Sequence, residues 1–249
     1  MQYQVKHRNS ADMTSEKQHT NYSKFIIASH ARSGSNLLLN SLNSHPNLIA
    51  EHEIFAAHNR NIGENFQPTL DNLFRARPKD ISAVGCKIFY YHLNEAEWQQ
   101  ISKIPNLKVI HLKRQNRLSM IVSMKVAFKT DQWGITNESD RIEADKKQVY
   151  LDYDFLRNSF EKIELWEENI NELFGQSQIA NISYENLSQH YGETISSLFN
   201  FLGVPEIPIE QIKTKHKKQN PEPLDRLIQN YAELKAKFAN SPWKHYFNC

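Results

Sequence analysis

The fold is decided by one stretch of the sequence, KFIIASHARSGSNLLL, which runs from Lys24 to Leu39. A short apolar run ends at small and basic residues, and a helical apolar pattern follows at once, which is typical of a strand, a tight loop and a helix N-terminus. Ser33, Ser35 and Asn36 are residue types that cap helices, so we expect their side chains to hydrogen-bond backbone N–H groups. With the helix dipole and the charge of Arg32, the loop is predicted to hold an anion such as phosphate. An ordinary helix start without a ligand is the alternative that the loop alone leaves open.

Two common nucleotide motifs are missing from this loop. A nucleoside-triphosphate loop reads G-x-x-x-x-G-K-[ST], and a dinucleotide loop reads G-x-G-x-x-G. The 7 glycines of the chain form neither spacing, and no Lys-Ser or Lys-Thr closes the loop. The predicted anion is therefore held without the lysine of a triphosphate loop.

Composition indicates a single α/β domain with a sizeable core. The chain has 249 residues and a net charge of +2, from 30 basic and 28 acidic residues, which argues against general nucleic-acid or membrane-surface binding. No apolar run approaches the ~18 residues of a membrane span. We expect residues 1–23 to be a polar lead-in without a signal peptide, and residues 24–249 to form the domain. The 2 cysteines suggest neither a disulfide framework nor a metal site, so we expect a cytoplasmic, metal-independent protein.

Strand-like and helical patterns alternate along the chain. The expected strands are Phe25–Ser29, Ala83–Tyr90, Lys108–Leu112 and Gln178–Ser183. The expected helices are Asn36–Ser44, Glu95–Ile104, Leu118–Lys129, Phe155–Phe174, Thr194–Leu202 and a final one over Pro223–Asn240. This order predicts a mainly parallel sheet with helices on both faces and a ligand at the carboxyl ends of its strands. The polar region Gly134–Tyr150 is left open, as an ordered loop or a mobile flap.

A second strand also ends in basic residues, in the stretch KVIHLKRQNRLSMIVSM from Lys108 to Met124. Arg114 lies at the expected strand end, and Ser123 follows two helical turns later. An arginine can bind phosphate oxygens bidentately, and a serine hydroxyl can add a donor. Alone, an arginine such as Arg114 is more often a partner in a surface ion pair than a ligand-binding residue. Two basic strand ends in one parallel sheet predict a ligand with two separated anionic groups.

These motifs resemble those of sulfotransferases that use 3′-phosphoadenosine 5′-phosphosulfate (PAPS). Arg32–Leu37 resembles the 5′-phosphosulfate loop of that family, and Arg114 with Ser123 resembles its 3′-phosphate site in the carbohydrate-type and bacterial branches. Further motifs agree in order along the chain, and they are Ser44–Asn47 with Glu53–Phe55, Ser183–Leu187 with Phe201–Pro205, and Lys218–Pro221. The resemblance covers nearly the whole chain from Phe25. Asn186 departs from it, since the family usually has Asp there.

The resemblance implies a P-loop-like, three-layer α/β fold and transfer of a sulfuryl group from PAPS to a hydroxyl of a sugar, lipid or natural product. The product would be adenosine 3′,5′-bisphosphate (PAP). The implied cofactor-binding residues are Arg32, Ser33, Gly34, Ser35, Asn36, Leu37, Arg114, Ser123, Tyr184, Lys217 and Lys218. Arg32 is placed at the 5′-phosphate and the bridging oxygen, and Lys217 and Lys218 over the 3′-phosphate. For Tyr184, a half-buried aromatic at a strand end stays an open alternative.

The resemblance also implies the catalytic groups. Glu53 is our choice for the general base, with Glu51 and His52 as neighbouring alternatives. Lys87 resembles a second-strand lysine that faces the transferred group. His92 is the other candidate base, as in the cytosolic small-molecule branch, unless it only caps or covers the strand end. Two other functions stay open: a kinase-like phosphotransferase, disfavoured by the missing loop lysine, and a non-catalytic nucleotide-binding protein of the same fold.

Overall fold

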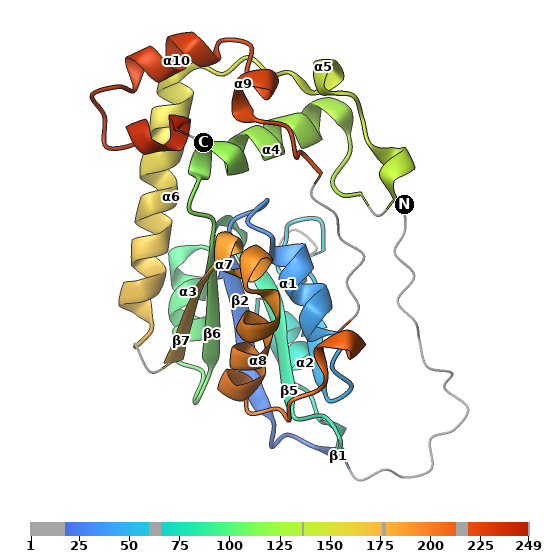
Figure 1. The fold of residues 1–249 in the computed structure, drawn as a ribbon. Helices are drawn as coiled ribbons and strands as arrows, with labels where there is room; N and C mark the ends of the chain where they lie inside the picture. Colours follow the sequence, from blue (N-terminus) through green and yellow to red (C-terminus); the bar gives the residue numbers. More distant parts are fainter. Residues whose placement is uncertain (1–17, 60–65, 136, 176–177, 213–218, 249) are drawn as a thin grey trace.

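A five-stranded parallel sheet forms the centre of the computed structural model, which describes residues 18–59, 66–135, 137–175, 178–212 and 219–248 (Figure 1). β2 (Ser23–Ser29) lies in the middle, between β5 (Ala83–Phe89) and β6 (Lys108–Lys113). The edges are β3 (Leu48–Glu51) and β7 (Ile179–Ser183). All 7 residues of β5 are buried, and all except Lys87 are apolar, as expected of a parallel strand that is covered on both faces. The prediction of a parallel α/β sheet is confirmed.

Helices cover both faces of this sheet and the carboxyl ends of its strands. They are α1 (Ser35–Leu42), α2 (Phe66–Leu73), α3 (Glu95–Ser102), α4 (Arg117–Thr130), α5 (Ala144–Lys147), α6 (Tyr153–Leu173), α7 (Tyr184–Gln189), α8 (Tyr191–Leu202), α9 (Leu224–Leu227) and α10 (Tyr231–Lys237). Alternate residues of β2 enter different cores: Ile26 packs with α2, α3 and the end of α6, whereas Ile27 packs with α1, α7 and α8. Each such fully buried side chain stabilises the fold by about 1.5–3 kcal/mol.

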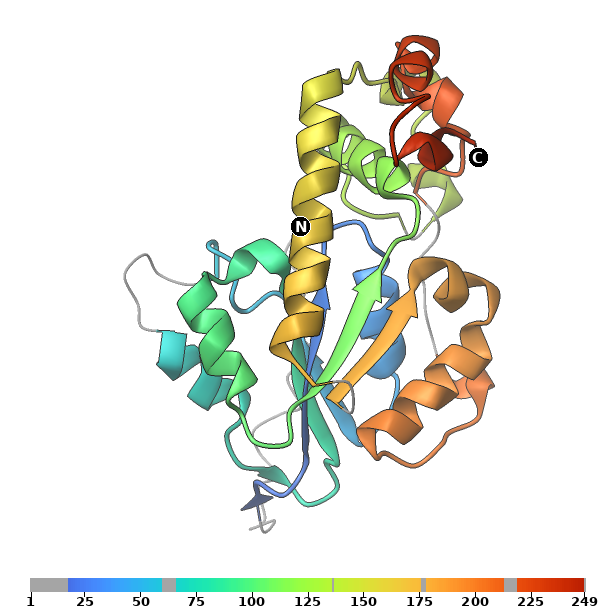
Figure 2. The same ribbon diagram turned by 90° about the vertical axis from the view of Figure 1, so that its left-hand side faces the viewer.

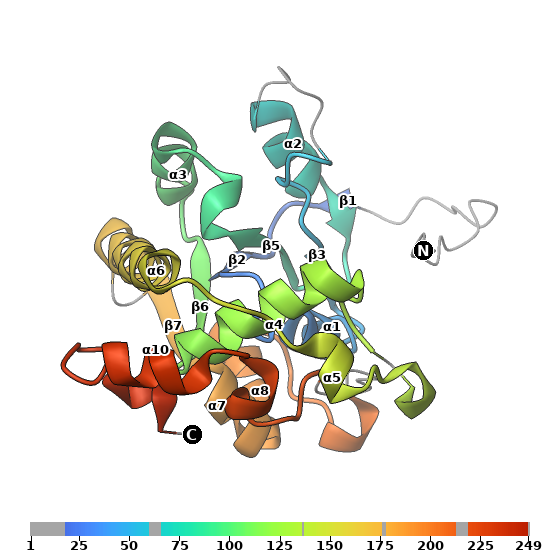
Figure 3. The ribbon, with the colours of Figure 1, turned by 90° about the horizontal axis from the view of Figure 1, so that it is seen from above.

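A third core lies beyond the carboxyl ends of the strands. The first half of α6 packs there with α4, α9 and α10 through Leu156, Phe160 and Ile163. Figure 2 shows α6, in yellow, extending from the sheet to these helices. In the view from above, α4 crosses over the sheet (Figure 3). Any ligand at the strand ends is therefore covered by this helical layer.

One long final helix over Pro223–Asn240 was expected, and this prediction is wrong. The segment forms two short helices, α9 and α10, and the break between them is caused by tertiary hydrogen bonds. Ile228 forms a parallel bridge with Val149, and Gln229 N donates to the Val149 carbonyl over 2.9 Å. Asn230 exchanges two side-chain hydrogen bonds with the backbone of Leu151. These contacts replace the i to i−4 bonds that a continuous helix needs.

Three short segments that the sequence left unassigned contribute to the fold. β3 follows α1 and adds an edge strand, and β1 (Gln18–His19) pairs with β4 (Arg77–Pro78) in a separate two-stranded sheet. The polar lead-in was expected to cover residues 1–23. Residues 1–17 lie outside the described residues, and Tyr22, near the end of the lead-in, is buried in the folded domain. The polar region Gly134–Tyr150 contains α5, whose last residue, Lys147, is buried.

Candidate active site

A cavity of about 1270 Å³ lies at the carboxyl ends of the strands. Its wall includes ten of the predicted site residues: Arg32, Gly34, Ser35, Asn36, Leu37, Glu53, His92, Arg114, Ser123 and Tyr184. Ser33 and Lys87 are buried beside the cavity rather than in its wall. Lys217 and Lys218 lie outside the described residues. Five segments that are far apart in the sequence thus supply one site.

The loop after β2 turns through two left-handed residues. Arg32 has φ of 66° and Gly34 has φ of 90°. A Cβ on Gly34 would lie 2.4 Å from Cδ2 of Tyr184, so both the backbone angle and the packed ring require glycine here. This close approach brings Tyr184, the first residue of α7, onto the loop.

The prediction that serine and asparagine side chains cap this helix is wrong. The N-cap of α1 is Gly34, and no side chain caps the helix. The Asn36 amide oxygen instead accepts from Lys87, and the buried Ser33 hydroxyl has no partner among the described residues. Glycine is tolerated at this position because the loop needs φ > 0, which a serine would adopt only with strain. The first-turn N–H groups of α1 therefore remain available to an anion.

The guanidinium of Arg32 contacts three neutral oxygen atoms. It donates to Ser123 Oγ (3.0 Å), to the Trp133 carbonyl (2.6 Å) and to Gln219 Oε1 (2.5 Å). Burial and, to a smaller extent, nearby Arg114 together lower the pKa of Arg32 to about 10, but the group stays protonated at neutral pH. Its positive charge thus has no carboxylate among the partners that the structure describes, which favours an anionic ligand.

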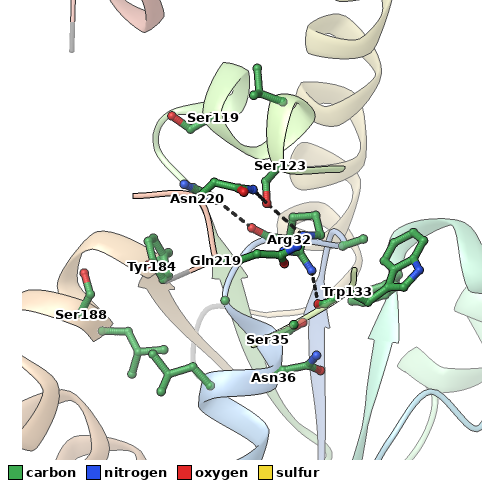
Figure 4. Close-up of a pocket in the computed structure, with 18 of the residues that line it drawn as sticks. Arg32, Ser35, Asn36, Ser119, Ser123, Trp133, Tyr184, Ser188, Gln219 and Asn220 are labelled. Carbon is green, nitrogen blue, oxygen red and sulfur yellow. Dashed lines mark hydrogen bonds between the residues drawn. The ribbon is translucent and has the colours of Figure 1, made fainter. Parts of the chain in front are cut away.

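Arg114 is the second cation of the site. Its Nη1 donates to the Arg32 carbonyl over 3.1 Å, and its guanidinium lies 4.9 Å from the centre of the Tyr184 ring. Its Nε is buried without a partner in the described part of the chain. Burial lowers the pKa of Arg114, while Tyr184 and Glu185 act in the opposite direction. Figure 4 shows Arg32, Ser123, Gln219 and Asn220 gathered in the cavity between Tyr184 and Trp133.

A buried lysine and a carboxylate form the other part of the site. Nζ of Lys87 lies 2.8 Å from Glu53 Oε1 and 2.5 Å from Asn36 Oδ1, and its side chain is 1% exposed. Burial lowers the pKa of Lys87, Glu53 opposes this effect and Arg32 adds to it. Glu53 lies two residues after edge strand β3 and lines the cavity, whereas Glu51 and His52 do not.

His92 lies beside this pair with one ring nitrogen already occupied. The Phe89 N–H donates to His92 Nδ1 over 3.2 Å, and Nε2 lies 3.9 Å from Glu53 Oε2. Because Nδ1 accepts a hydrogen bond, we infer that the neutral ring carries its proton on Nε2. In this tautomer His92 presents a donor to Glu53 and has no ring nitrogen left to accept a proton.

Sequence reasoning assigned no role to two groups that hold Arg32. Gln219 belongs to a motif that the resemblance had singled out, but its contact crosses 187 positions of the chain. Trp133 contributes its backbone carbonyl, and a carbonyl leaves no signal in the residue type. Ser119, one turn before Ser123 on α4, also lines the cavity.

The described residues contain neither a cluster of metal ligands nor a membrane-spanning helix. No group of three or more His, Cys, Asp or Glu side chains in the described part could hold a metal ion. Among the described helices, none combines the length and apolar character needed to cross a membrane.

Comparison with known proteins places this site in a family. Residues 22–248 match the model of the sulfotransferase domain family. Nodulation protein H of Rhizobium meliloti strain 1021 is 27% identical over 240 residues, which cover 90% of this chain and 94% of the relative. Nodulation protein H of Rhizobium tropici is 25% identical over 234 residues, covering 90% and 92%.

Solved structures share the fold at lower sequence identity. A sulfotransferase from Alicyclobacillus acidocaldarius superimposes with a TM-score of 0.50 at 18% identity, covering 91% of this chain and 94% of the other. The sulfotransferase domain from the curacin biosynthetic pathway gives a TM-score of 0.50 at 16% identity, covering 91% and 95%.

Proposed function

The chain belongs to the sulfotransferase domain family, and from this premise we propose that it takes the sulfuryl group from PAPS and transfers it to an acceptor hydroxyl. One observation carries the choice of donor. Arg32 and Arg114 meet at one cavity wall, and within the described residues neither guanidinium hydrogen-bonds a carboxylate. A nucleotide with phosphate groups at both its 5′ and 3′ positions would supply the missing negative charge.

The residues present fit such a nucleotide. The uncapped first turn of α1 and the unpartnered Ser33 hydroxyl offer donors for the 5′ group, together with Gly34, Ser35, Asn36 and Leu37. The unpartnered Nε of Arg114 and the Ser123 hydroxyl offer donors for the 3′-phosphate. Arg32 would exchange a neutral acceptor for the leaving 5′-phosphate, and a bond to a charged group contributes about 1.5–3 kcal/mol. Lys217 and Lys218 remain proposed partners of the 3′-phosphate.

The acceptor is activated by Glu53. As the acceptor oxygen bonds to sulfur, the bond from sulfur to the bridging oxygen breaks, and its electron pair stays on the leaving phosphate. The hydroxyl proton goes to the Glu53 carboxylate, which lines the cavity. Lys87 fixes Glu53 and Asn36 by its two hydrogen bonds and adds positive charge near the transferred group. Positioning and charge stabilisation of this kind supply much of the rate enhancement in group transfer.

Three further features of the proposed reaction are its independence of metal, its acceptor and its cellular compartment. We propose that two arginines and one lysine provide the positive charge that a metal provides in many phosphoryl transferases, so that catalysis needs no metal. The acceptor is a hydroxyl of a sugar, lipid or natural product. With Cys86 buried and unpaired, we place the protein in the cytoplasm, where thiols stay reduced.

The proposal is tested by incubating the protein with sulfur-labelled PAPS and a panel that contains a sugar, a hydroxylated lipid and a phenol. We expect label on at least one acceptor and an equal amount of PAP released. Transfer of phosphate from ATP in its place would contradict the choice of donor. Binding of PAP without transfer to any member of the panel would favour a non-catalytic nucleotide-binding protein.

A further inference from the structure

The side chain of Lys147 is buried although the reaction proposed above does not use it. Lys147 is the last residue of the short helix α5, and its side chain is 1% exposed. The helix lies in the polar region Gly134–Tyr150, to which the sequence analysis assigned no function. Its neighbour Lys146 is 71% exposed and pairs with Glu143 at the surface. Burying an ammonium group is costly unless it is paired and hydrogen-bonded. The contacts that compensate for this cost therefore show which segments Lys147 joins.

Lys147 binds the segment that begins at Gln219. Its Nζ donates to the Gln219 carbonyl over 3.1 Å and lies 2.8 Å from Glu222 Oε1. One cation thus joins both ends of a four-residue stretch that contains Pro221. α5 contacts α4 and α9 as well, so this ammonium is fixed by packed helices on either side.

The same segment reaches the predicted phosphate-binding residues. The Gln219 side chain accepts from Arg32 Nη2 and donates to the Gln132 carbonyl, so both ends of its amide are engaged. Nδ2 of Asn220 donates to Ser123 Oγ over 3.3 Å. Backbone held by Lys147 therefore carries the two amides that contact Arg32 and Ser123 (Figure 4).

We propose that Lys147 is a positioning residue for nucleotide binding: it holds the Gln219 backbone so that the Gln219 amide orients the Arg32 guanidinium in the cavity. This inference rests on the proposed function, which assigns a nucleotide to the cavity. Glu222 is the counter-ion of Lys147, and it also lines the cavity. Removal of Lys147 alone would leave Glu222 as an unpaired carboxylate beside an anion site, so the test must separate these two effects.

The experiment therefore replaces Lys147 in a protein from which the negative charge of Glu222 has already been removed. In Glu222→Gln protein, we expect Lys147→Met to weaken PAP binding about tenfold by calorimetry, since a lost hydrogen bond of about 1.4 kcal/mol corresponds to a factor of ten. Lys147→Arg should recover most of the affinity, and Lys146→Met, the matched surface control, should leave it within twofold. Thermal unfolding of each variant verifies that the protein compared is folded.

A double-mutant cycle tests whether Lys147 acts through Gln219. In the Glu222→Gln background that also carries Gln219→Ala, we expect the effect of Lys147→Met on PAP affinity to fall below about threefold. If the effect stays tenfold, Lys147 does not act through Gln219. If Lys147→Met leaves PAP affinity unchanged in the Glu222→Gln protein, the proposal itself is overturned. Failure of the unmodified protein to bind PAP is a separate result, which would overturn the proposed function and with it this inference.

Discussion

Nε of Arg32 donates to the hydroxyl of Ser123 over 3.0 Å, which joins the loop after β2 to helix α4. The sequence assigned these residues to opposite ends of one nucleotide, and the structure brings them into contact. The Ser123 hydroxyl also accepts from Asn220, so its two acceptor positions are used. A phosphate that binds Arg32 must therefore compete with these hydrogen bonds. Substitutions that change the hydrogen bonds should accordingly change the affinity for the nucleotide.

Substitution of Gly34 should impair the phosphate loop. Gly34→Ala places a Cβ 2.4 Å from the Tyr184 ring at a φ of 90°, so we expect a lower melting temperature and at least tenfold weaker PAP binding. Gly192→Ala is the matched control, because its Cβ would meet only Ile209 at 3.6 Å. Equal behaviour of the two variants in thermal unfolding and calorimetry would contradict the strained geometry assigned to this loop.

Replacement of Glu53 should affect turnover rather than nucleotide binding. General-base catalysis contributes about 10²–10⁴-fold, so Glu53→Gln should lower kcat by about that factor and leave PAP affinity within about threefold. Glu51→Gln is the control, since Glu51 does not line the cavity. His92→Ala should lower kcat less than tenfold, because its Nδ1 already accepts from Phe89. A near-normal Glu53→Gln enzyme with an inactive His92→Ala enzyme would reverse the two roles.

Removal of divalent metal should leave activity intact. Among the described residues, Arg32 and Arg114 line the cavity and Lys87 is buried beside it, and these cations can stabilise the leaving phosphate without a metal. We expect turnover in excess EDTA to stay within twofold of turnover in magnesium. Activity that is lost in EDTA and restored by magnesium would argue for a metal-assisted transferase.

Stability should decrease in mild acid because of His111. Burial and nearby Lys113 lower the pKa of His111 to about 3, although Asn171 and Asn181 oppose the shift. Between about pH 6.5, the usual histidine pKa, and pH 3, the unfolded chain binds a proton that the folded chain does not. Stability must therefore fall as the pH falls, by up to about 1.4 kcal/mol per pH unit for this group.

Urea unfolding from pH 7 to pH 5 measures this effect. The His111→Gln variant should be less stable at pH 7, because the ring bonds with Tyr90 and Asn171 are lost, and its stability should depend less on pH than that of the unmodified protein. Parallel stability–pH curves for the two proteins would show that His111 does not titrate in this way.

The parallel sheet was predictable from sequence because its signal is local. A buried strand such as β5 is apolar except at Lys87, and the basic residues after β2 and β6 mark where strands end. The break before Tyr231 was not predictable, since it depends on hydrogen bonds to Val149 and Leu151 about 80 positions away. Local propensity there favours one helix, and tertiary contacts override it.

The site was predictable in its residue types but less so in its contacts. Arg32 and Arg114 follow predicted strands, and parallel strands bring such ends to one edge of the sheet. Glu53 was assigned through the family resemblance, because the strand before it, β3, was not predicted. The capping of α1 was wrong because a left-handed Gly34 took the N-cap position. The carbonyl of Trp133 and the amide of Gln219 reach Arg32 only through the folded chain.

The central claim, that one nucleotide spans the loop after β2 and Arg114, is tested most directly by calorimetry with PAP and 5′-AMP. Contacts to a second phosphate contribute about 1.5–3 kcal/mol per charged bond, so PAP should bind at least about tenfold more tightly. Arg114→Ala should reduce that preference to within about threefold, whereas Lys113→Ala, a neighbouring residue outside the cavity wall, should preserve it. Equal affinity of the unmodified protein for PAP and 5′-AMP would contradict the account.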